Sequence, residues 1–178
     1  MSTTLMPIYT YDLNCKMFRD FAKLYTDYIH ELSVYSERIK REEVTDAEIE
    51  LAWLNPDLRR YFVNQGKDCI GFLLIGINEN KHESSNWFIA EFYIAKEYQG
   101  KGIGKKAIRD LLGSKKGAYC LFILEENKRA LCFWDKTFSE SGYIDTTEFY
   151  SCDCAPNDCV FKMYEPKDSI SPSILKER

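Results

Sequence analysis

The sequence of 178 residues has no stretch that approaches the roughly 20 consecutive apolar residues of a membrane-spanning helix. The segment from Met1 to Tyr11 also lacks the basic start and the long apolar run of a secretory signal. We therefore expect a cytoplasmic protein that has no membrane partner.

Positive charge and histidine are scarce as well. Lysines and arginines total 24 against 28 aspartates and glutamates, which gives a net charge of −4, and there are two histidines. Nucleic-acid binding needs a basic surface that displaces counterions from phosphates, so no nucleic-acid partner is expected. The seven cysteines are odd in number and scattered, which favours reduced thiols. The spacing of Cys152, Cys154 and Cys159 matches no common zinc site, and no metal is expected.

The composition, 45% hydrophobic and 29% charged, is that of a globular rather than a disordered chain, and the α/β class follows from the order of the predicted elements. Apolar periodicity and turn signals predict strand 8–11, helix 15–32, a helix from Thr45 to Pro56, strands 60–64 and 69–77, loop 78–85, strand 86–94, helix 103–112, strand 118–124, helix 127–139, and strands 143–150 and 159–164. Thr45 and Glu48 form a predicted capping box. We expect one domain over residues 1–165, with helices on both faces of a mixed sheet, and a mobile tail over 166–178.

Three glycines, Gly100, Gly102 and Gly104, stand where strand 86–94 gives way to helix 103–112. The first N–H groups of a helix lack partners within it and lie at the positive end of its dipole, so they favour an anion. Without Cβ atoms, this backbone can be approached by a phosphate group. The neighbouring cations are Lys101, Lys105, Lys106 and Arg109. The segment predicts a phosphate site, with a solvated basic turn as the structural alternative.

Several phosphate-binding designs contain glycines of this kind. A Walker loop needs four residues between its glycines and a Ser or Thr after the Lys, and the segment has neither. The run from Gly102 to Ala107 does satisfy the dinucleotide pattern G-x-G-x-x-A, and Glu125 follows at about the spacing of a ribose-binding acid. However, seven residues separate Ile94 from Gly102, whereas the dinucleotide turn is tight. A nicotinamide-dependent oxidoreductase therefore stays an alternative.

Two motifs resemble those of the GNAT superfamily of N-acetyltransferases. Residues Gln99 to Gly104 fit Q/R-x-x-G-x-G/A, and Asn127 to Trp134 fit N-x-x-A-x-x-F-Y/W. The resemblance is strong over residues 86–145. It implies a mostly antiparallel mixed sheet whose central strands, 86–94 and 118–124, splay apart, with acetyl-CoA as co-substrate between them. It also implies an amine acceptor, and it allows a homodimer because members of this family often dimerise.

The resemblance assigns cofactor contacts by position. It places main-chain contacts to the pantetheine arm on strand 86–94, the pyrophosphate on the backbone N–H groups of the glycine loop, and a further contact on the helix that follows the next strand. The residues so assigned are Phe92, Tyr93, Ile94, Gln99, Gly100, Lys101, Gly102, Ile103, Gly104, Lys105, Asn127, Phe133 and Trp134. Asn127 is also suited to cap the helix that follows it.

Acetyl transfer to an amine needs a neutral nucleophile and a stabilised oxyanion. Glu91, an acid in an apolar strand, is the candidate base because desolvation would raise its pKa, and a solvent-facing Glu91 is the alternative. A backbone N–H of Tyr93 or Ile94 would stabilise the oxyanion. Many relatives carry a proton-donating Tyr at the position of Trp134, and indole cannot supply that proton. Tyr143 or Tyr98 could substitute, and Trp134 could be a core residue.

The resemblance implies that the first helices cover the active site. We expect an aromatic and acidic wall, suited to a cationic amine, that consists of Tyr28, Glu31, Tyr35 and Glu37. A solvated helix face explains the two glutamates equally well. The sequence thus predicts an acetyl-CoA-dependent N-acetyltransferase that acts on a primary amine of a small molecule by direct attack in a ternary complex. A non-catalytic acyl-CoA-binding or sensing domain is the alternative, because Trp134 replaces the usual Tyr.

Overall fold

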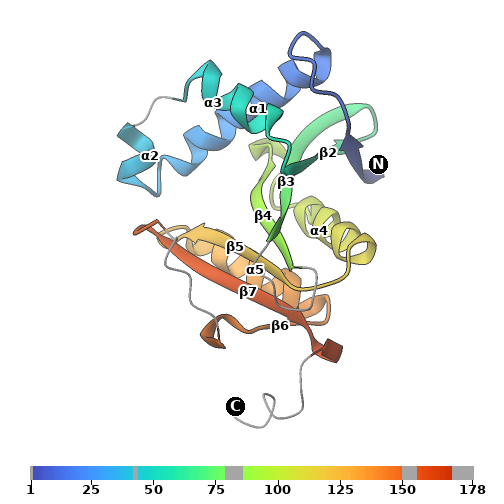
Figure 1. The fold of residues 1–178 in the computed structure, drawn as a ribbon, viewed down its shortest axis with the longest axis vertical. Coiled ribbons are helices and arrows are strands. Elements are labelled where there is room, and N and C mark those ends of the chain that lie inside the picture. The colour runs from blue at the N-terminus through green and yellow to red at the C-terminus, as the bar shows by residue number, and fades with distance from the viewer. Residues whose placement is uncertain (1, 42–43, 79–85, 150–155, 170–178) are drawn as a thin grey trace.

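Seven strands of one sheet and five helices make up the part of the chain that the structure, a computed structural model, describes: residues 2–41, 44–78, 86–149 and 156–169 (Figure 1). The helices are α1 (Lys16–Leu32), α2 (Glu37–Arg41), α3 (Asp46–Leu54), α4 (Ile103–Ser114) and α5 (Lys128–Glu140). The strands are β1 (Thr3–Ile8), β2 (Leu58–Gln65), β3 (Asp68–Asn78), β4 (Asn86–Ile94), β5 (Tyr119–Leu124), β6 (Tyr143–Asp145) and β7 (Cys159–Pro166).

The sheet has the order β1-β2-β3-β4-β5-β7-β6, and only the β4–β5 pair among these neighbours is parallel. Alternation along β3 sends Phe72 and Leu74 to the face covered by α1 and α3, while Leu73 and Ile75 face α4 and α5. The predicted fold, a mixed and mostly antiparallel sheet with helices on both faces, is confirmed.

The central strands β4 and β5 pair only at their beginnings. The register runs from Trp87 opposite Tyr119 to Ile89 opposite Leu121, and no later pair joins the two strands in the described residues. The ladder between β3 and β4 shifts at the same point, where Leu74 lies opposite Glu91 and Ile75 opposite Ile89. Figure 1 shows β4 turning away from β5 beyond this point. The predicted splay of the central strands is therefore present, and it opens the middle of the sheet.

The helix beginnings follow the sequence signals closely. Cys15 caps α1, since its sulfur accepts a hydrogen bond from the Phe18 N–H at 3.3 Å. At α3, the Thr45 hydroxyl accepts from the Glu48 N–H at 3.3 Å, and the Glu48 carboxylate accepts from the Thr45 N–H at 2.7 Å. The predicted capping box is confirmed, and the sequence pattern alone located both helices.

Two predicted strands were wrong in detail, and one short helix was missed. The first strand is Thr3–Ile8 rather than 8–11, because this stretch pairs with β2 while Tyr9 is 84% exposed. The short α2 was missed because five residues show no apolar period. Within the described part of the strand predicted over 143–150, only β6 (Tyr143–Asp145) is a strand and a 3-10 helix follows at Thr147–Phe149, while residue 150 lies outside the described residues.

The predicted end of the domain at residue 165 falls inside β7, where Pro166 pairs with Tyr143, and a 3-10 helix at Lys167–Ser169 follows. The rest of the predicted tail, 170–178, lies outside the described residues, as do 79–85 of the predicted loop.

Candidate active site

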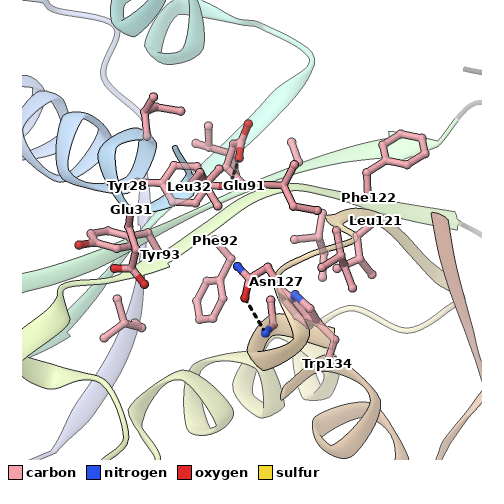
Figure 2. A pocket seen from close by; sticks show the side chains of 18 of the residues that line it. Tyr28, Glu31, Leu32, Glu91, Phe92, Tyr93, Leu121, Phe122, Asn127 and Trp134 are labelled. Atoms are coloured by element: carbon pink, nitrogen blue, oxygen red, sulfur yellow. Dashed lines mark hydrogen bonds between the residues drawn. The ribbon is translucent and has the colours of Figure 1, made fainter. Parts of the chain in front are cut away.

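A cavity of about 980 Å³ extends from the glycine loop, past the gap between β4 and β5, to the underside of α1, α2 and α3 (Figure 2). The sequence-predicted residues that line it are Glu91, Phe92, Tyr93, Ile94, Gln99, Gly100, Gly102, Gly104, Lys105, Asn127, Phe133 and Trp134. Most of the predicted site is thus brought together along one continuous space, although these residues come from β4, the glycine loop, α4 and α5.

The glycine loop holds two residues in the left-handed region, Gly100 at φ +73° and Gly102 at φ +75°. Only glycine adopts this conformation without strain, and a Cβ at either position would have open space around it. Gly102 is also the N-cap of α4 and has no side chain to accept from the first N–H groups of that helix. These N–H groups and the positive end of the helix dipole therefore favour an anion from the cavity.

Gly104 lies within α4 and also lines the cavity. A Cβ there would come 3.4 Å from the Phe133 ring and 3.5 Å from the Phe92 ring, which is ordinary contact. These two rings stack at a centroid distance of 6.0 Å. The expectation that Gly104 admits a phosphate group stays a prediction.

The cations beside the glycine loop are largely paired with protein acids. Glu140 accepts from both Lys105 and Arg109, the latter at 3.2 Å, and Lys106 pairs with Asp110 at 2.7 Å. The remaining lysine of the group, Lys101, is exposed and lies 5.6 Å from the centre of the Tyr98 ring. Among these cations only Lys105 lines the cavity. The backbone N–H groups at the start of α4 therefore share the attraction for an anion with Lys105, whose charge is partly balanced by Glu140.

Gln99 connects the glycine loop to the two walls of the cavity. Its side-chain amide donates to the Ile94 carbonyl at 2.8 Å and to the Glu31 carboxylate at 3.0 and 3.2 Å. The first residue of the glycine motif therefore holds the end of β4 and the side of α1 in place. The bond to Glu31 was missed at the sequence level because the two residues are far apart along the chain.

Glu91 lies partly buried on β4, directed toward α1, and its Oε2 accepts a hydrogen bond from the Tyr28 hydroxyl. Burial raises the pKa of Glu91 from 4.5 to about 7, because a carboxylate loses hydration inside the protein, while the Tyr28 bond acts in the lowering direction. The same surroundings raise the pKa of Tyr28 well above its usual value of 10. A solvent-facing Glu91, the alternative from the sequence, does not match this arrangement.

Asn127 lies on the far side of the gap from β4 (Figure 2). Its Oδ1 accepts from the Ala130 N–H at 3.0 Å and so caps α5, as the sequence predicted. The side chain also lines the cavity. Because the cap uses Oδ1, the side-chain NH₂ group of Asn127 is not needed for capping.

Aromatic rings form the wall beside Asn127. Trp134 is 6% exposed, and its ring centre lies 5.6 Å from that of Phe92 and 5.0 Å from that of Phe133. Trp134 therefore belongs to the core and also borders the cavity. Tyr143, in contrast, is not among the described residues that line the cavity; it packs against Phe138 with ring centres 5.4 Å apart.

Two other predicted residues do not line the cavity with their side chains. Lys101 is exposed, and Ile103 is buried in the core beneath α4. For both residues the expected contact was from the backbone N–H group to the pyrophosphate of the coenzyme, and this contact stays a prediction. On the predicted acceptor side, Tyr28, Glu31 and Tyr35 line the cavity, whereas Glu37 is exposed and pairs with Lys40.

Metal ligands and membrane spans were also searched for. Of the three clustered cysteines, Cys152 and Cys154 lie outside the described residues. Within residues 2–41, 44–78, 86–149 and 156–169, no three His, Cys, Asp or Glu side chains gather as metal ligands would. None of the helices in these ranges combines the length and the apolar character that crossing a bilayer requires.

The fold and the site together define a class of α/β protein in which two central strands, here β4 and β5, separate within the sheet. The uncapped N–H groups at the start of a helix, here α4, lie at one end of the gap. The Acetyltransferase (GNAT) family model matches residues 18–139. The chain therefore belongs to the GNAT family of acetyltransferases. No curated protein sequence matches it.

Solved structures share this fold at low sequence identity. PH1933 from Pyrococcus horikoshii is 18% identical, with a TM-score of 0.62 over 92% of this chain and 98% of that one. A protein described as histone acetyltransferase HPA2 and related acetyltransferase, from Corynebacterium glutamicum, is 12% identical, with a TM-score of 0.64 over 93% and 97%. The PaiA N-acetyltransferase from Thermoplasma acidophilum, solved in complex with coenzyme A, is 17% identical, with a TM-score of 0.60 over 93% and 99%.

Proposed function

We propose that this protein transfers the acetyl group of acetyl-CoA to a primary amine of a small molecule by direct attack in a ternary complex. The observation that carries the proposal is the position of Glu91. It lines the same cavity as the glycine loop, at the place where β4 leaves β5, and its pKa of about 7 suits proton transfer near neutral pH.

The residues present fit acetyl-CoA. The N–H groups at the start of α4, behind Gly102, suit the diphosphate. Beyond Ile89, β4 is no longer paired with β5, so its backbone groups on that edge can hydrogen-bond the extended pantetheine arm by strand addition. The coenzyme complex of the Thermoplasma acidophilum relative supports this assignment for the same fold. The coenzyme supplies an activated thioester, and the chain supplies its binding and orientation.

In the proposed reaction, the amine nitrogen bonds to the thioester carbonyl carbon and the carbon–sulfur bond breaks. Glu91 accepts the proton that the amine must lose, and a backbone N–H of Tyr93 or Ile94 stabilises the oxyanion. Trp134 borders the cavity but carries an indole N–H, which gives no proton to the departing sulfur. A thiol with an ordinary pKa of about 8.5 can leave as thiolate, so the transfer does not depend on a Tyr at this position.

The experiment is a thioester-consumption assay with acetyl-CoA and a panel of primary amines, alongside a binding measurement for CoA. We expect CoA to raise the melting temperature and at least one amine to be acetylated. A melting temperature that NAD or NADP raises and CoA leaves unchanged would instead support the oxidoreductase alternative.

Trp134 supports a second candidate function, a non-catalytic acyl-CoA sensor. Its indole occupies the position where many relatives place a proton-donating Tyr, and Tyr143, one proposed substitute, packs in the core away from the cavity. Tight CoA binding without turnover across the amine panel would favour this candidate over the transferase.

A further inference from the structure

The cavity has an apolar end beneath the first three helices. Its side-chain lining there includes Ile29, Leu32, Ile39, Val44, Leu51 and Ala52, which we call the apolar pocket. Tyr28 and Glu91, which are hydrogen-bonded to each other, line the same cavity, and Tyr28 lies on α1 as Ile29 and Leu32 do. An acceptor whose amino group reaches Glu91 from this side therefore places the rest of its body among aliphatic side chains.

The acids on this side are mostly engaged elsewhere. Glu31 accepts two hydrogen bonds from Gln99, and the Glu48 carboxylate accepts from the N–H and the hydroxyl of Thr45 in the capping box, at 2.7 and 2.9 Å. Glu37 does not line the cavity. Glu31 and Glu48 keep their charge in these hydrogen bonds, but Glu91 is the described lining carboxyl group that lies on β4, at the gap of the sheet.

The two walls of the cavity are joined beside the apolar pocket. The Ser36 hydroxyl donates to Asp158, and Arg38 pairs with the same carboxylate at 3.3 Å. This link ties α2 to the residue that precedes β7, and both Arg38 and Cys159 line the cavity next to it. The link therefore fixes the distance between the two walls at this end of the cavity.

The geometry points to a small monoamine with an apolar alkyl or aryl body as the acceptor, in preference to a polyamine or another polycation. The inference rests on the proposed function, because it concerns the acceptor of that reaction. A second ammonium group placed among these aliphatic side chains would lose its hydration there, which is strongly unfavourable, and the other lining carboxylates, Glu31 and Glu48, already accept hydrogen bonds from Gln99 and Thr45. Each methylene buried there would improve binding roughly fourfold.

The test compares amines that differ in one feature. With saturating acetyl-CoA, kcat/KM is measured for propylamine, butylamine and hexylamine, and for 1,6-diaminohexane, which matches hexylamine in length but carries a second ammonium. We expect kcat/KM to rise along the alkyl series and hexylamine to exceed the diamine by about tenfold or more. Equal or better turnover of the diamine or of spermidine would overturn the inference while leaving the proposed function intact.

A peptide acceptor is tested in the same assay. A peptide with an apolar first residue that is acetylated better than hexylamine would overturn the choice of a small molecule. If no amine is acetylated although CoA binds, both the proposed function and this inference fail.

A variant pair locates the effect in the pocket. Leu51 lines the cavity and is 70% exposed, so Leu51→Glu introduces a carboxylate at the rim with little risk to folding. Val34, 78% exposed and not part of the described lining, is the matched control. We expect Leu51→Glu to lower kcat/KM for hexylamine and to raise it severalfold for the diamine, with Val34→Glu changing neither. Identical behaviour of the two variants would overturn the placement of the acceptor.

Discussion

The hydroxyl of Tyr28 on α1 donates a hydrogen bond to Oε2 of Glu91 on β4. This bond joins α1, which lines one side of the cavity, to β4, the strand that separates from β5 after Ile89. It also sets the state of the acid, because hydrogen bonding to a carboxylate lowers its pKa while burial raises it. The balance of the two, a pKa of about 7, governs several measurable properties of the protein.

Replacing the acid tests its proposed role as the base. Glu91→Gln keeps the size of the side chain and cannot accept the proton, so kcat/KM at pH 7.5 should fall by about 100-fold. The wild-type rate should rise through a pH of about 7, as the carboxylate forms, and this limb should vanish in the variant. Glu97→Gln, at an exposed acid that does not line the cavity, is the control. An unchanged rate and pH profile for Glu91→Gln would exclude the role.

Removing the hydroxyl of Tyr28 should move the titration of Glu91. In Tyr28→Phe the carboxylate loses a donor, so its pKa rises and the rising limb of kcat/KM shifts to higher pH. At pH 7 we expect a loss of about two- to tenfold with CoA affinity unchanged, because the coenzyme contacts are elsewhere. A uniform loss at all pH values would instead indicate a purely structural role for Tyr28.

The raised pKa of Glu91 also predicts how stability depends on pH. Below pH 4.5 the acid is protonated in both states; between 4.5 and about 7 the folded state holds the proton and the unfolded state does not. The contribution of Glu91 to the free energy of unfolding is therefore fully present below pH 4.5 and declines as the pH rises toward 7. Glu91→Gln lacks this decline, so its melting temperature relative to wild type should increase from pH 4.5 to pH 7.5. A difference that stays constant over this window would contradict the assignment.

Two glycines near the ends of the same helix should respond oppositely to alanine. Gly102→Ala forces a Cβ into a left-handed residue at φ +75°, which should cost about 1 kcal/mol and weaken CoA binding by about tenfold. Gly113 has no positive φ and open space around its Cβ position, so Gly113→Ala should stabilise by about 0.5 kcal/mol without affecting CoA. Urea unfolding and CoA titration of both variants provide the comparison, and equal CoA affinity would contradict a role for the loop.

A pair of variants at Asn127 separates capping from coenzyme contact. Asp caps helices as well as Asn does, so Asn127→Asp should retain the bond from the Ala130 N–H and the stability of the protein. It replaces the amide donor with a carboxylate, and CoA should bind more weakly. Asn127→Ala loses the cap and should be destabilised by about 1 kcal/mol. If Asn127→Asp binds CoA as wild type does, the side chain serves only as a cap.

The features of the candidate site that were predicted from the sequence are those that depend on local backbone conformation. The glycine loop, the end of β4 and the cap at Asn127 are local features, with neighbouring residues fixing their conformation. Side chains that act through distant partners were less predictable. Trp134 and Tyr143 are both aromatic residues near the end of the motif region, yet one borders the cavity and the other packs with Phe138 behind it.

The amino-acid sequence by itself determined the order of the strands and of the helices other than α2, the helix starts at Cys15 and Thr45, and the glycine at the N-cap of α4, Gly102. Each of these follows from local periodicity, capping and backbone conformation. Only the tertiary structure decided that β4 and β5 part after Ile89, that Tyr28 reaches Glu91, and that aliphatic residues of three helices line one end of the cavity. These are contacts between segments far apart in the chain, and burial, which raises the pKa of Glu91, exists only once the segments pack together.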